Sequence, residues 1–326
     1  MNRIGCRVIY LPSRVKHYYR YKKRLKKVMM NTPYLAVWGN YSGLTNIDLM
    51  VYGKLYGVPM RIAHSHGSQL YWGSWFMKYV VFILHYMNKM RLCKYATHYW
   101  TCSSVSGRFM FSKNIWKKMT VIPNGVDINK FRYNAQIRDE VRKEFEFASD
   151  DIVVGHVARL CEVKNQHYLL KIFKEIVKQE PLAKCLLVGD GELRKELEET
   201  IKELQITRNV IMTGERSDIP RILNAMDVFV LTSMSEGLSV SAVEAQAVGL
   251  PCVLPMTVSR ENDITGRVTF VSLDAGEEIW AKTIIDSARK GFKDTKIDII
   301  EKGFDIISSS ECLYRYFISG MDGVHE

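Results

Sequence analysis

Short apolar runs alternate with longer stretches of helical periodicity along almost the whole chain. The runs have the lengths of strands and are bounded by turn-forming residues, whereas the stretches between them repeat apolar residues with a helical period. Repeated strand–helix alternation is typical of parallel sheets with helices on both faces, so the pattern predicts an α/β protein with doubly wound sheets. The expected strands are Arg7–Leu11, Tyr34–Trp38, Arg61–His64, His98–Cys102, Thr120–Ile122, Ile152–Ala158, Lys184–Val188, Val210–Thr213, Asp227–Leu231, Cys252–Leu254 and Val268–Val271.

A turn-forming cluster from Pro123 to Asp127 divides the chain. We expect one Rossmann-like domain over residues 1–125 and a second over residues 126–300, facing each other across a ligand-binding cleft. A C-terminal helix is expected over residues 301–326, packing back towards the first domain. The clearest helical patterns are Ile137–Phe147, Asn165–Lys178 and Glu192–Leu204.

The first domain lacks the usual opening of a doubly wound domain, in which a strand and a glycine-rich turn lead into a helix. Its first expected strand leads instead into Arg14–Met30, which is rich in Lys and Arg and contains no acid. We therefore expect a first domain that is abbreviated at its start.

Positive charge is concentrated in the first domain. Of the chain's 46 Lys and Arg residues, 21 lie in residues 1–130, together with only two of its 35 acids, Asp48 and Asp127. Such asymmetry indicates an anionic partner, and nucleic acid, phosphorylated lipid and an anionic membrane surface all qualify. Because no nucleic-acid-reading motif is present, we expect no nucleic-acid partner.

No signal peptide or membrane-spanning segment is evident in the sequence. The most apolar stretch, Tyr71–Met90, is interrupted by Lys78, His85 and Lys89. Its aromatic residues fit a core helix, the interpretation that we favour, or a helix lying against an interface. The seven cysteines are scattered and form no CxxC pair, so we expect buried reduced thiols in a cytoplasmic protein rather than disulfides.

Two cations, Arg159 and Lys164, stand between the end of an expected strand and the start of the next helix. A helix amino terminus carries partial positive charge, so this position favours an anion. A diphosphate is the natural ligand, because Arg can bind two oxygens and Lys supplies a mobile point charge. A solvated surface pair is the alternative.

Two carboxylates, Glu236 and Glu244, follow the expected strand Asp227–Leu231. In an open α/β sheet, ligands collect at the carboxyl ends of strands, and ionised carboxylates accept hydrogen bonds from sugar hydroxyls. The pair is therefore expected to hold a small polyol at two points. Gly189 to Gly191 predicts a tight strand–helix turn, and Gly214 and Glu215 follow the next strand and are expected to line the same pocket.

Two histidines, His64 and His66, follow a strand of the first domain, and we expect one of them to contact a ligand. A zinc site would need further clustered ligands, and no Cys or His partners stand at metal-ligating spacing. No Asp-x-Asp sequence occurs either, so we expect neither a metal nor another cofactor.

Taken together, these features resemble the group 1 glycosyltransferases, the family-4 retaining enzymes of GT-B fold that act on nucleotide sugars. The resemblance covers residues 120–260 most closely, and the stretch Arg61–His66 is similar to the bacterial capsular and exopolysaccharide branch. The residues that carry it are Arg159, Lys164, the Val188–Gly191 turn, Ser235-Glu236-Gly237, Glu244-Ala245 and Gly249-Leu250-Pro251.

The resemblance implies a role for each matching residue. Arg159 and Lys164 would hold the diphosphate, Glu236 the transferred sugar and Glu244 the ribose. His66 would reach the donor sugar from the first domain. Further donor-binding groups would be the backbone amides of Gly237, Leu238 and Ser239, together with Gly214 and Glu215.

We therefore expect a retaining glycosyltransferase that moves a sugar from a nucleotide-sugar donor, expected to be a UDP-sugar, to a growing surface-polysaccharide or lipid-linked acceptor. The expected location is the cytoplasm, at the inner face of the membrane, with the basic first domain against the anionic lipid surface. The alternative is a truncated, catalytically weak or inactive relative that binds a nucleotide sugar or assists a partner enzyme. A GT-B epimerase would not account for the basic first domain.

Overall fold

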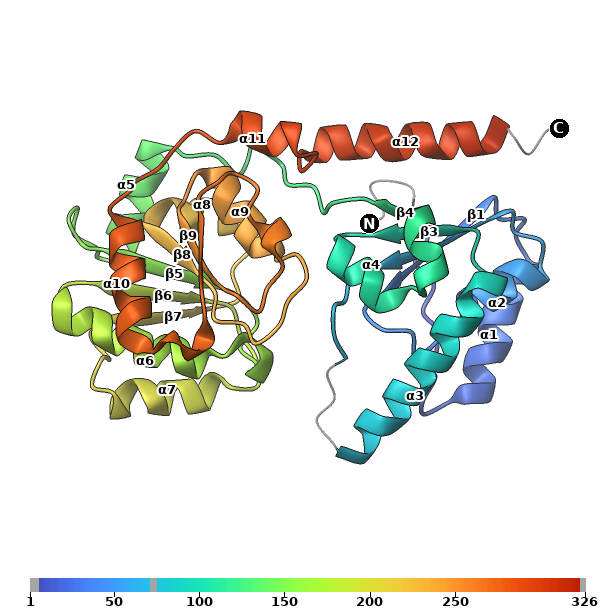
Figure 1. The fold of residues 1–326 in the computed structure, drawn as a ribbon, viewed down its shortest axis with the longest axis horizontal. Helices are drawn as coiled ribbons and strands as arrows, with labels where there is room; N and C mark the ends of the chain where they lie inside the picture. Colours follow the sequence, from blue (N-terminus) through green and yellow to red (C-terminus); the bar gives the residue numbers. More distant parts are fainter. Residues whose placement is uncertain (1–5, 71–74, 323–326) are drawn as a thin grey trace. The chain divides into compact units, whose positions relative to one another are not determined.

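The computed structural model describes residues 6–70 and 75–322 and divides into two compact units. Unit 1 comprises Met1–Ile122 with Arg315–Glu326, and unit 2 comprises Pro123–Tyr314. Each unit is built around one parallel sheet with helices packed against it (Figure 1). The expectation of a two-sheet α/β protein is therefore confirmed.

The described part of unit 1 contains four parallel strands in the order β1-β2-β3-β4. Because consecutive parallel strands are neighbours and such crossovers are right-handed, the connecting helices lie on one face of the sheet. The core on that face joins Leu25 of α1 to Val37 of β1 and Met50 of α2. The strands are β1 (Ala36–Tyr41), β2 (Met60–Ser65), β3 (His98–Thr101) and β4 (Met119–Val121), and the helices are α1 (Tyr18–Met30), α2 (Asp48–Leu55), α3 (Trp75–Arg91), η2 (Leu92–Lys94), α4 (Ser104–Met110) and η3 (Lys113–Lys118).

The other face of this sheet is aromatic. Strand side chains alternate between the two faces, so Trp38 and Trp100 point away from the core formed with α1 and α2. The C-terminal helix α12 (Ile306–Asp322) covers them, with the Tyr316 ring centroid 5.1 Å from that of Trp100 and the Phe317 centroid 6.3 Å from that of Trp38.

The expected strand Arg7–Leu11 is wrong, because residues 6–13 lie in neither a strand nor a helix. Val8 is 47% exposed and Tyr10 is 85% exposed, so Ile9 is the one apolar residue of this run that is partly buried, too little to fix the segment against the sheet as a strand. Within the basic stretch Arg14–Met30, the helix α1 begins at Tyr18.

Helix α3 also differs from the interpretation that we favoured. Val81 and His85 are buried, but a row of apolar side chains on the same helix is exposed, so α3 is not a core helix on all sides. Residues 71–74 of the expected segment lie outside the described residues. The exposed apolar residues of α3 are Met77, Tyr79, Phe82, Ile83, Tyr86, Met87 and Met90. Within the described ranges, no helix is long and apolar enough to cross a membrane.

Unit 2 contains six parallel strands in the order β10-β9-β8-β5-β6-β7, the order of the Rossmann fold. The strands are β5 (Val153–Val157), β6 (Lys184–Val188), β7 (Val210–Gly214), β8 (Val228–Val230), β9 (Cys252–Pro255) and β10 (Val268–Val271). The helices are α5 (Ala135–Glu144), η4 (Glu162–Lys164), α6 (Gln166–Gln179), α7 (Arg194–Glu203), α8 (Ile219–Ala225), α9 (Val240–Val248), η5 (Arg260–Asn262), η6 (Leu273–Ala275), α10 (Glu277–Ala288) and α11 (Lys296–Glu301).

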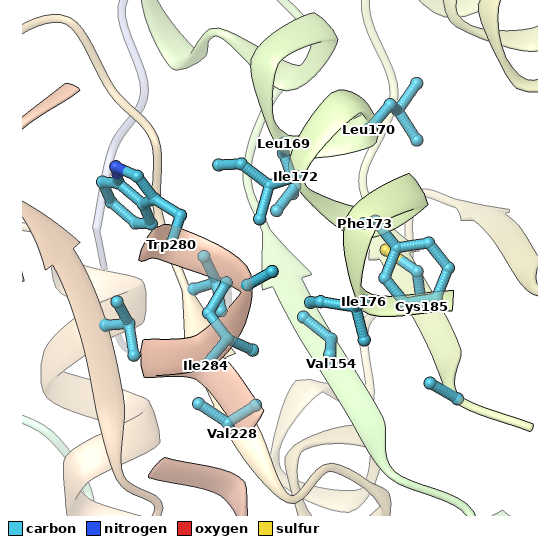
Figure 2. Close-up of a cluster of buried hydrophobic side chains, with 14 of the residues drawn as sticks. Val154, Leu169, Leu170, Ile172, Phe173, Ile176, Cys185, Val228, Trp280 and Ile284 are labelled. Carbon is cyan, nitrogen blue, oxygen red and sulfur yellow. The ribbon is translucent and has the colours of Figure 1, made fainter. Parts of the chain in front are cut away.

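Apolar layers cover both faces of this sheet. On one face, Phe173 and Ile176 of α6 pack with Ile284 of α10 and with Val154 and Val228 of the strands (Figure 2). On the other face, α8 and α9 pack against the alternate strand residues. The two layers hold the strands in register, so the loops at their carboxyl ends start from fixed points. All seven cysteines are free thiols, but only Cys102, Cys185 and Cys252 are buried, whereas Cys6, Cys93 and Cys312 are exposed.

Candidate functional site

The loops that follow β5 and β8 meet at the topological switch point of the second sheet. Strands β5 and β8 are neighbours, with Val154 paired to Val228. From β5 the chain continues to β6 on one side, and from β8 it continues to β9 on the other. Ligands of open α/β sheets bind in the crevice outside the carboxyl ends of the strands at such a point.

Lys164 and Glu236 form an ion pair across this point. The Lys164 ammonium nitrogen lies 2.7 Å from Glu236 Oε1, and each side chain is 19% exposed. Ser233 Oγ donates to Glu236 Oε2 at 3.2 Å. The carboxylate is therefore held from two sides, with both charges open to the surface of the crevice.

Backbone-directed hydrogen bonds fix the loop from Arg159 to Asn165 in place. Thr232 Oγ1, just after β8, lies 3.1 Å from the Lys164 carbonyl oxygen and 3.0 Å from that of Asn165, and its hydrogen is shared between them. The Met234 amide donates to the Val163 carbonyl at 2.8 Å. These bonds tie the loop after β5 directly to the loop after β8.

His156 supports the same loop from inside the sheet. It is fully buried on β5, its Nδ1 donates to the Val230 carbonyl at 2.9 Å, and Gln166 Nε2 donates to its Nε2 at 3.2 Å. Gln166 Nε2 also donates to the Arg159 carbonyl at 2.9 Å. Burial lowers the pKa of His156 to about 4, with a smaller contribution in the same direction from Lys164, so the ring is neutral at physiological pH.

Arg159 lies at the start of the loop and points to a different partner. Its guanidinium is 3.0 Å from Glu192 Oε2, and the two side chains are 72% and 54% exposed. An exposed ion pair of this kind is weak, so Arg159 can easily exchange Glu192 for another anion. The Lys164 side chain is thus largely buried in its ion pair, whereas that of Arg159 is largely exposed.

The turn from Gly189 to Gly191 packs tightly against the start of this loop. A Cβ on Gly189, where φ is +129°, would lie 2.1 Å from the Ala158 carbonyl oxygen, and one on Gly191 would lie 2.2 Å from that of Leu160. Asp190 Oδ1 accepts from the Gly191 amide at 2.7 Å. The expected tight strand–helix turn is therefore confirmed.

Gly214 lies at the end of β7, two strands from β5, and its carbonyl accepts from the Gly189 amide at 2.9 Å. Gly214 is thus brought to the edge of the tight turn. Glu215 is exposed, and its assignment to the donor site stays a prediction.

The loop from Gly237 to Ser239 leads into α9 and is anchored by Asn262. Asn262 Nδ2 donates to the Gly237 carbonyl at 2.8 Å, and the Ser239 amide donates to Asn262 Oδ1, also at 2.8 Å. The Ser239 amide is therefore committed to a side chain, which corrects its expected use for a phosphate. The roles of the amides of Gly237 and Leu238 stay predictions.

Glu244 lies on α9, a little over one turn after this loop, and is half-buried. Burial raises the pKa of its carboxyl group to about 7. Among the described residues it makes no hydrogen bond or ion pair that would offset this burial. A half-buried carboxyl group of this kind is a candidate for binding hydroxyls.

His66 belongs to unit 1, directly after β2. Its Nε2 donates to Asn40 Oδ1 at 2.9 Å, and its ring centroid lies 4.1 Å from that of His64. His64 Nδ1 accepts from Trp38 Nε1 at 3.2 Å. Burial lowers the pKa of both histidines, that of His64 to about 3, so both rings are neutral at physiological pH.

Sequence reasoning missed Thr232, Gln166, His156 and Asn262, which position the loops rather than face the crevice. No local pattern marks them, because their partners are distant in the sequence. In the described part of the chain, no group of three or more His, Cys, Asp or Glu residues could hold a metal ion.

Comparison with known proteins identifies the family. The model described as "Glycosyl transferases group 1" matches residues 137–258. The putative glycosyltransferase EpsF of Bacillus subtilis (strain 168) is 31% identical over 297 residues, which cover 88% of this chain and 75% of the relative. The chain belongs to the group 1 glycosyltransferases. The inactive-relative alternative is not favoured by these matches.

Other relatives of this glycosyltransferase act in the biosynthesis of bacterial surface polysaccharides. The capsular polysaccharide biosynthesis glycosyltransferase CapM of Staphylococcus aureus is 29% identical over 223 residues, covering 65% of this chain and 57% of the relative. The expected placement beside bacterial capsular enzymes is thus confirmed.

Solved structures match the fold of this glycosyltransferase. Anabaena HepE in complex with UDP has a TM-score of 0.71 at 20% identity, with 91% of this chain and 82% of that chain covered. WaaG, involved in lipopolysaccharide biosynthesis, has a TM-score of 0.66 at 12% identity, with 91% and 80% covered. The GT-B fold predicted from the sequence is therefore confirmed.

Proposed function

We propose that this glycosyltransferase moves a sugar from a UDP-sugar to a growing surface-polysaccharide or lipid-linked acceptor, with retention of the anomeric configuration. The ion pair between Lys164 and Glu236 at the switch point is the observation that carries the proposal. A relative from Escherichia coli, 37% identical over 140 residues that cover 42% of this chain and 36% of the relative, is named UDP-Gal:alpha-D-GlcNAc-diphosphoundecaprenol alpha-1,3-galactosyltransferase. HepE has been crystallised with UDP-glucose.

The reaction breaks the bond between the anomeric carbon and the diphosphate oxygen. The acceptor oxygen bonds to that carbon, the diphosphate leaves with the bonding electron pair, and the acceptor's proton passes to the departing diphosphate. Positive charge develops on the sugar ring and negative charge on the leaving diphosphate. Preorganised donors aimed at that negative charge are usually the largest catalytic contribution.

Lys164 meets this requirement while it holds Glu236. An ammonium group has three donor hydrogens, and the bond to Glu236 Oε1 uses one of them. The remaining two are available to the diphosphate, while Glu236 keeps lone pairs for hydroxyls of the sugar. Arg159, held at the rim only by an exposed pair with Glu192, can exchange that partner for a phosphate oxygen.

We assign Glu244 to the ribose. A nucleoside offers neighbouring hydroxyls that an ionised carboxylate accepts in pairs, and half-buried Glu244 lacks other partners among the described residues. Binding of those hydroxyls stabilises the ionised form and thereby lowers the pKa that burial has raised to about 7. Ribose binding and ionisation of Glu244 are therefore linked.

We assign the acceptor to unit 1. A cavity of about 470 Å³ lies at the carboxyl ends of its first strands, and its lining includes Asn40, Ser42, Asn46 and Gln69 but no charged side chain. Uncharged amides and hydroxyls match the hydroxyls of a glycan. Asn40 also accepts from His66, which connects this cavity to the histidine assigned to the donor sugar.

We further propose that unit 1 lies against the anionic inner face of the membrane. The exposed apolar face of α3 and the cations of α1 support this location, since a basic patch beside apolar and aromatic side chains suits an anionic lipid interface. A lipid-linked acceptor would then be reached without leaving the membrane surface.

Incubation of the full chain with UDP-sugars and a lipid-linked diphosphate acceptor tests the proposal. We expect product from at least one UDP-sugar, no loss of activity with a chelator, and a product with the anomeric configuration of the donor by NMR. Arg159→Ala should reduce turnover about 100-fold. Full activity of Arg159→Ala would contradict the assignment of Arg159 to the diphosphate. A product with inverted anomeric configuration would contradict the proposed retention.

A further inference from the structure

A second cavity in unit 1 has the character of an anion site. Its volume is about 510 Å³, and it lies between the segment before α1, the last turns of α1 and the connection into β1. The polar and charged residues that line it are Arg7, Arg24, Lys27, Asn31, Thr32 and Tyr34. The set contains three cations, two amide or hydroxyl side chains from the connection, a phenol and no acid.

The cations of this cavity have no counter-charge among the residues from 6 to 122 other than Asp48. Arg24 and Lys27 stand three residues apart on α1, so both point to the same side of the helix. Asp48 is the only acid between residues 6 and 122, and it is paired with Arg14 at 3.2 Å. Within the described ranges, no ion pair is formed by Arg7, Arg24 or Lys27. A bound anion would therefore reduce the repulsion between these three cations.

The cavity is separate from the site assigned to the acceptor. It lies at the amino end of β1, where the connection from α1 enters the strand, whereas Asn40 and His66 lie at the carboxyl ends of β1 and β2. A six-residue strand places these two ends roughly 20 Å apart. An anion bound here is therefore separate from the cavity assigned to the acceptor.

We propose that this cavity binds a phosphate or diphosphate group as a second anion site of unit 1. Arg7 and Arg24 offer forked donors that match phosphate oxygens, Lys27 adds a point charge, and Asn31 and Thr32 supply neutral donors. The group has two possible sources, a free phosphorylated metabolite or the headgroup of a phospholipid. Both present the same oxygens to the cavity.

Binding measurements on the full chain distinguish the sources. Titration with inorganic pyrophosphate reports the free anion, and co-flotation with phosphatidylcholine vesicles, with and without phosphatidic acid, reports the headgroup. The test variant is Arg24→Gln/Lys27→Gln. The matched control is Lys23→Gln/Lys26→Gln, which removes the same charge from exposed positions of the same helix that do not line the cavity.

We expect the test variant to bind at least one probe about 100-fold more weakly, since each charged contact contributes roughly tenfold. The control should stay within about threefold of the original chain. Loss of pyrophosphate binding assigns a free anion, and loss of phosphatidic acid binding alone assigns a lipid headgroup. Equal losses in both variants, or no binding of either probe, would overturn the proposal. Neither readout depends on sugar transfer, and Arg24→Gln/Lys27→Gln leaves Lys164 and Arg159 of the donor site intact, so a loss of binding in this variant but not in the control reports the cavity of unit 1.

Discussion

The ammonium nitrogen of Lys164 lies 2.7 Å from a carboxylate oxygen of Glu236, although 72 positions separate the two residues. The contact exists because β5 and β8 are neighbours in the sheet, so the loops that follow them converge. Each side chain keeps a fifth of its surface open to solvent. The pair is therefore both a link between the loops and the polar centre of the candidate site.

Lys164 and Glu236 should behave as one unit in catalysis. We predict that Lys164→Met and Glu236→Gln each reduce turnover about 100-fold, and that the double variant is little worse than either. A double-mutant cycle on steady-state rates measures the coupling. Effects that simply add would show that the two residues act independently.

A matched pair on α6 serves as the control for this cycle. Lys178 lies 2.7 Å from Glu175, the same distance between the same residue types. Lys178→Met and Glu175→Gln should leave turnover within about twofold, since an exposed pair within one helix contributes little.

The affinity for nucleotide sugar should rise with pH through the pKa of Glu244. Burial raises this pKa to about 7, so the carboxyl group is largely protonated at about pH 6 and ionised at about pH 8, and we assign the ribose to the ionised form. UDP-glucose is a suitable probe, because its diphosphate does not titrate in this range. Calorimetric titrations across the range should show the rise, and Glu244→Gln should remove it. A pH-dependent affinity that persists in Glu244→Gln would reassign the titration to another group.

Gly189→Ala should damage both stability and nucleotide binding. The added Cβ would lie 2.1 Å from the Ala158 carbonyl oxygen, directly before Arg159, and the backbone there has a positive φ. We expect a loss of about 3 kcal/mol in the free energy of unfolding. Gly266→Ala is the control, since Gly266 also has a positive φ but no atom within 4 Å of its added Cβ. The free energy of unfolding of both variants is measured with a denaturant. Equal losses in Gly189→Ala and Gly266→Ala would show that the positive φ, and not the clash with the Ala158 carbonyl, causes the loss.

Asp227 should be a major contributor to the stability of unit 2. Its carboxylate lies 2.5 Å from Arg138 and 3.2 Å from Arg142, and it accepts the Val153 amide at 2.7 Å. Removing it leaves the buried Arg142 guanidinium without its ion-pair partner. We predict that Asp227→Ala lowers the free energy of unfolding by about 3 kcal/mol.

Glu180→Ala provides the comparison for Asp227→Ala. It removes an equally short pair with Arg289 that lies on the surface, and it should lower the free energy of unfolding by less than about 1 kcal/mol. Urea unfolding measures the free energy of unfolding of both variants. Similar losses in the two would contradict the claim that burial makes the Asp227 ion pairs more stabilising than the surface pair.

The second sheet was largely predictable from the sequence, because its apolar runs end at turn-forming residues. The strands Lys184–Val188 and Val210–Gly214 were predicted with the observed bounds or within one residue. The run Arg7–Leu11 is similarly apolar, but apart from the partly buried Ile9 its apolar side chains are exposed, so its local pattern predicts a strand that does not form. The runs of the second sheet become strands because neighbouring strands pair with them, whereas β-propensity alone does not make Arg7–Leu11 a strand.

The sequence identified the main residues of the candidate site but not the contacts between them. Lys164 and Glu236 were both singled out, yet their meeting depends on the strand order, which the alternating pattern leaves open. The buried His156 and Gln166 carry no local signal, since their bonds reach across the sheet. Burial of Glu244 likewise follows from the packing of α9 and not from its neighbours in sequence.

Release of UDP from a panel of UDP-sugars, with GDP-sugars beside them, tests the central claim most directly. The full chain should release UDP from at least one UDP-sugar in the presence of acceptor, and Lys164→Met should lose about 100-fold of that rate at saturating donor. Release of GDP but not of UDP would contradict the assigned base. A Lys164→Met variant as fast as the original chain would contradict the proposed donor site.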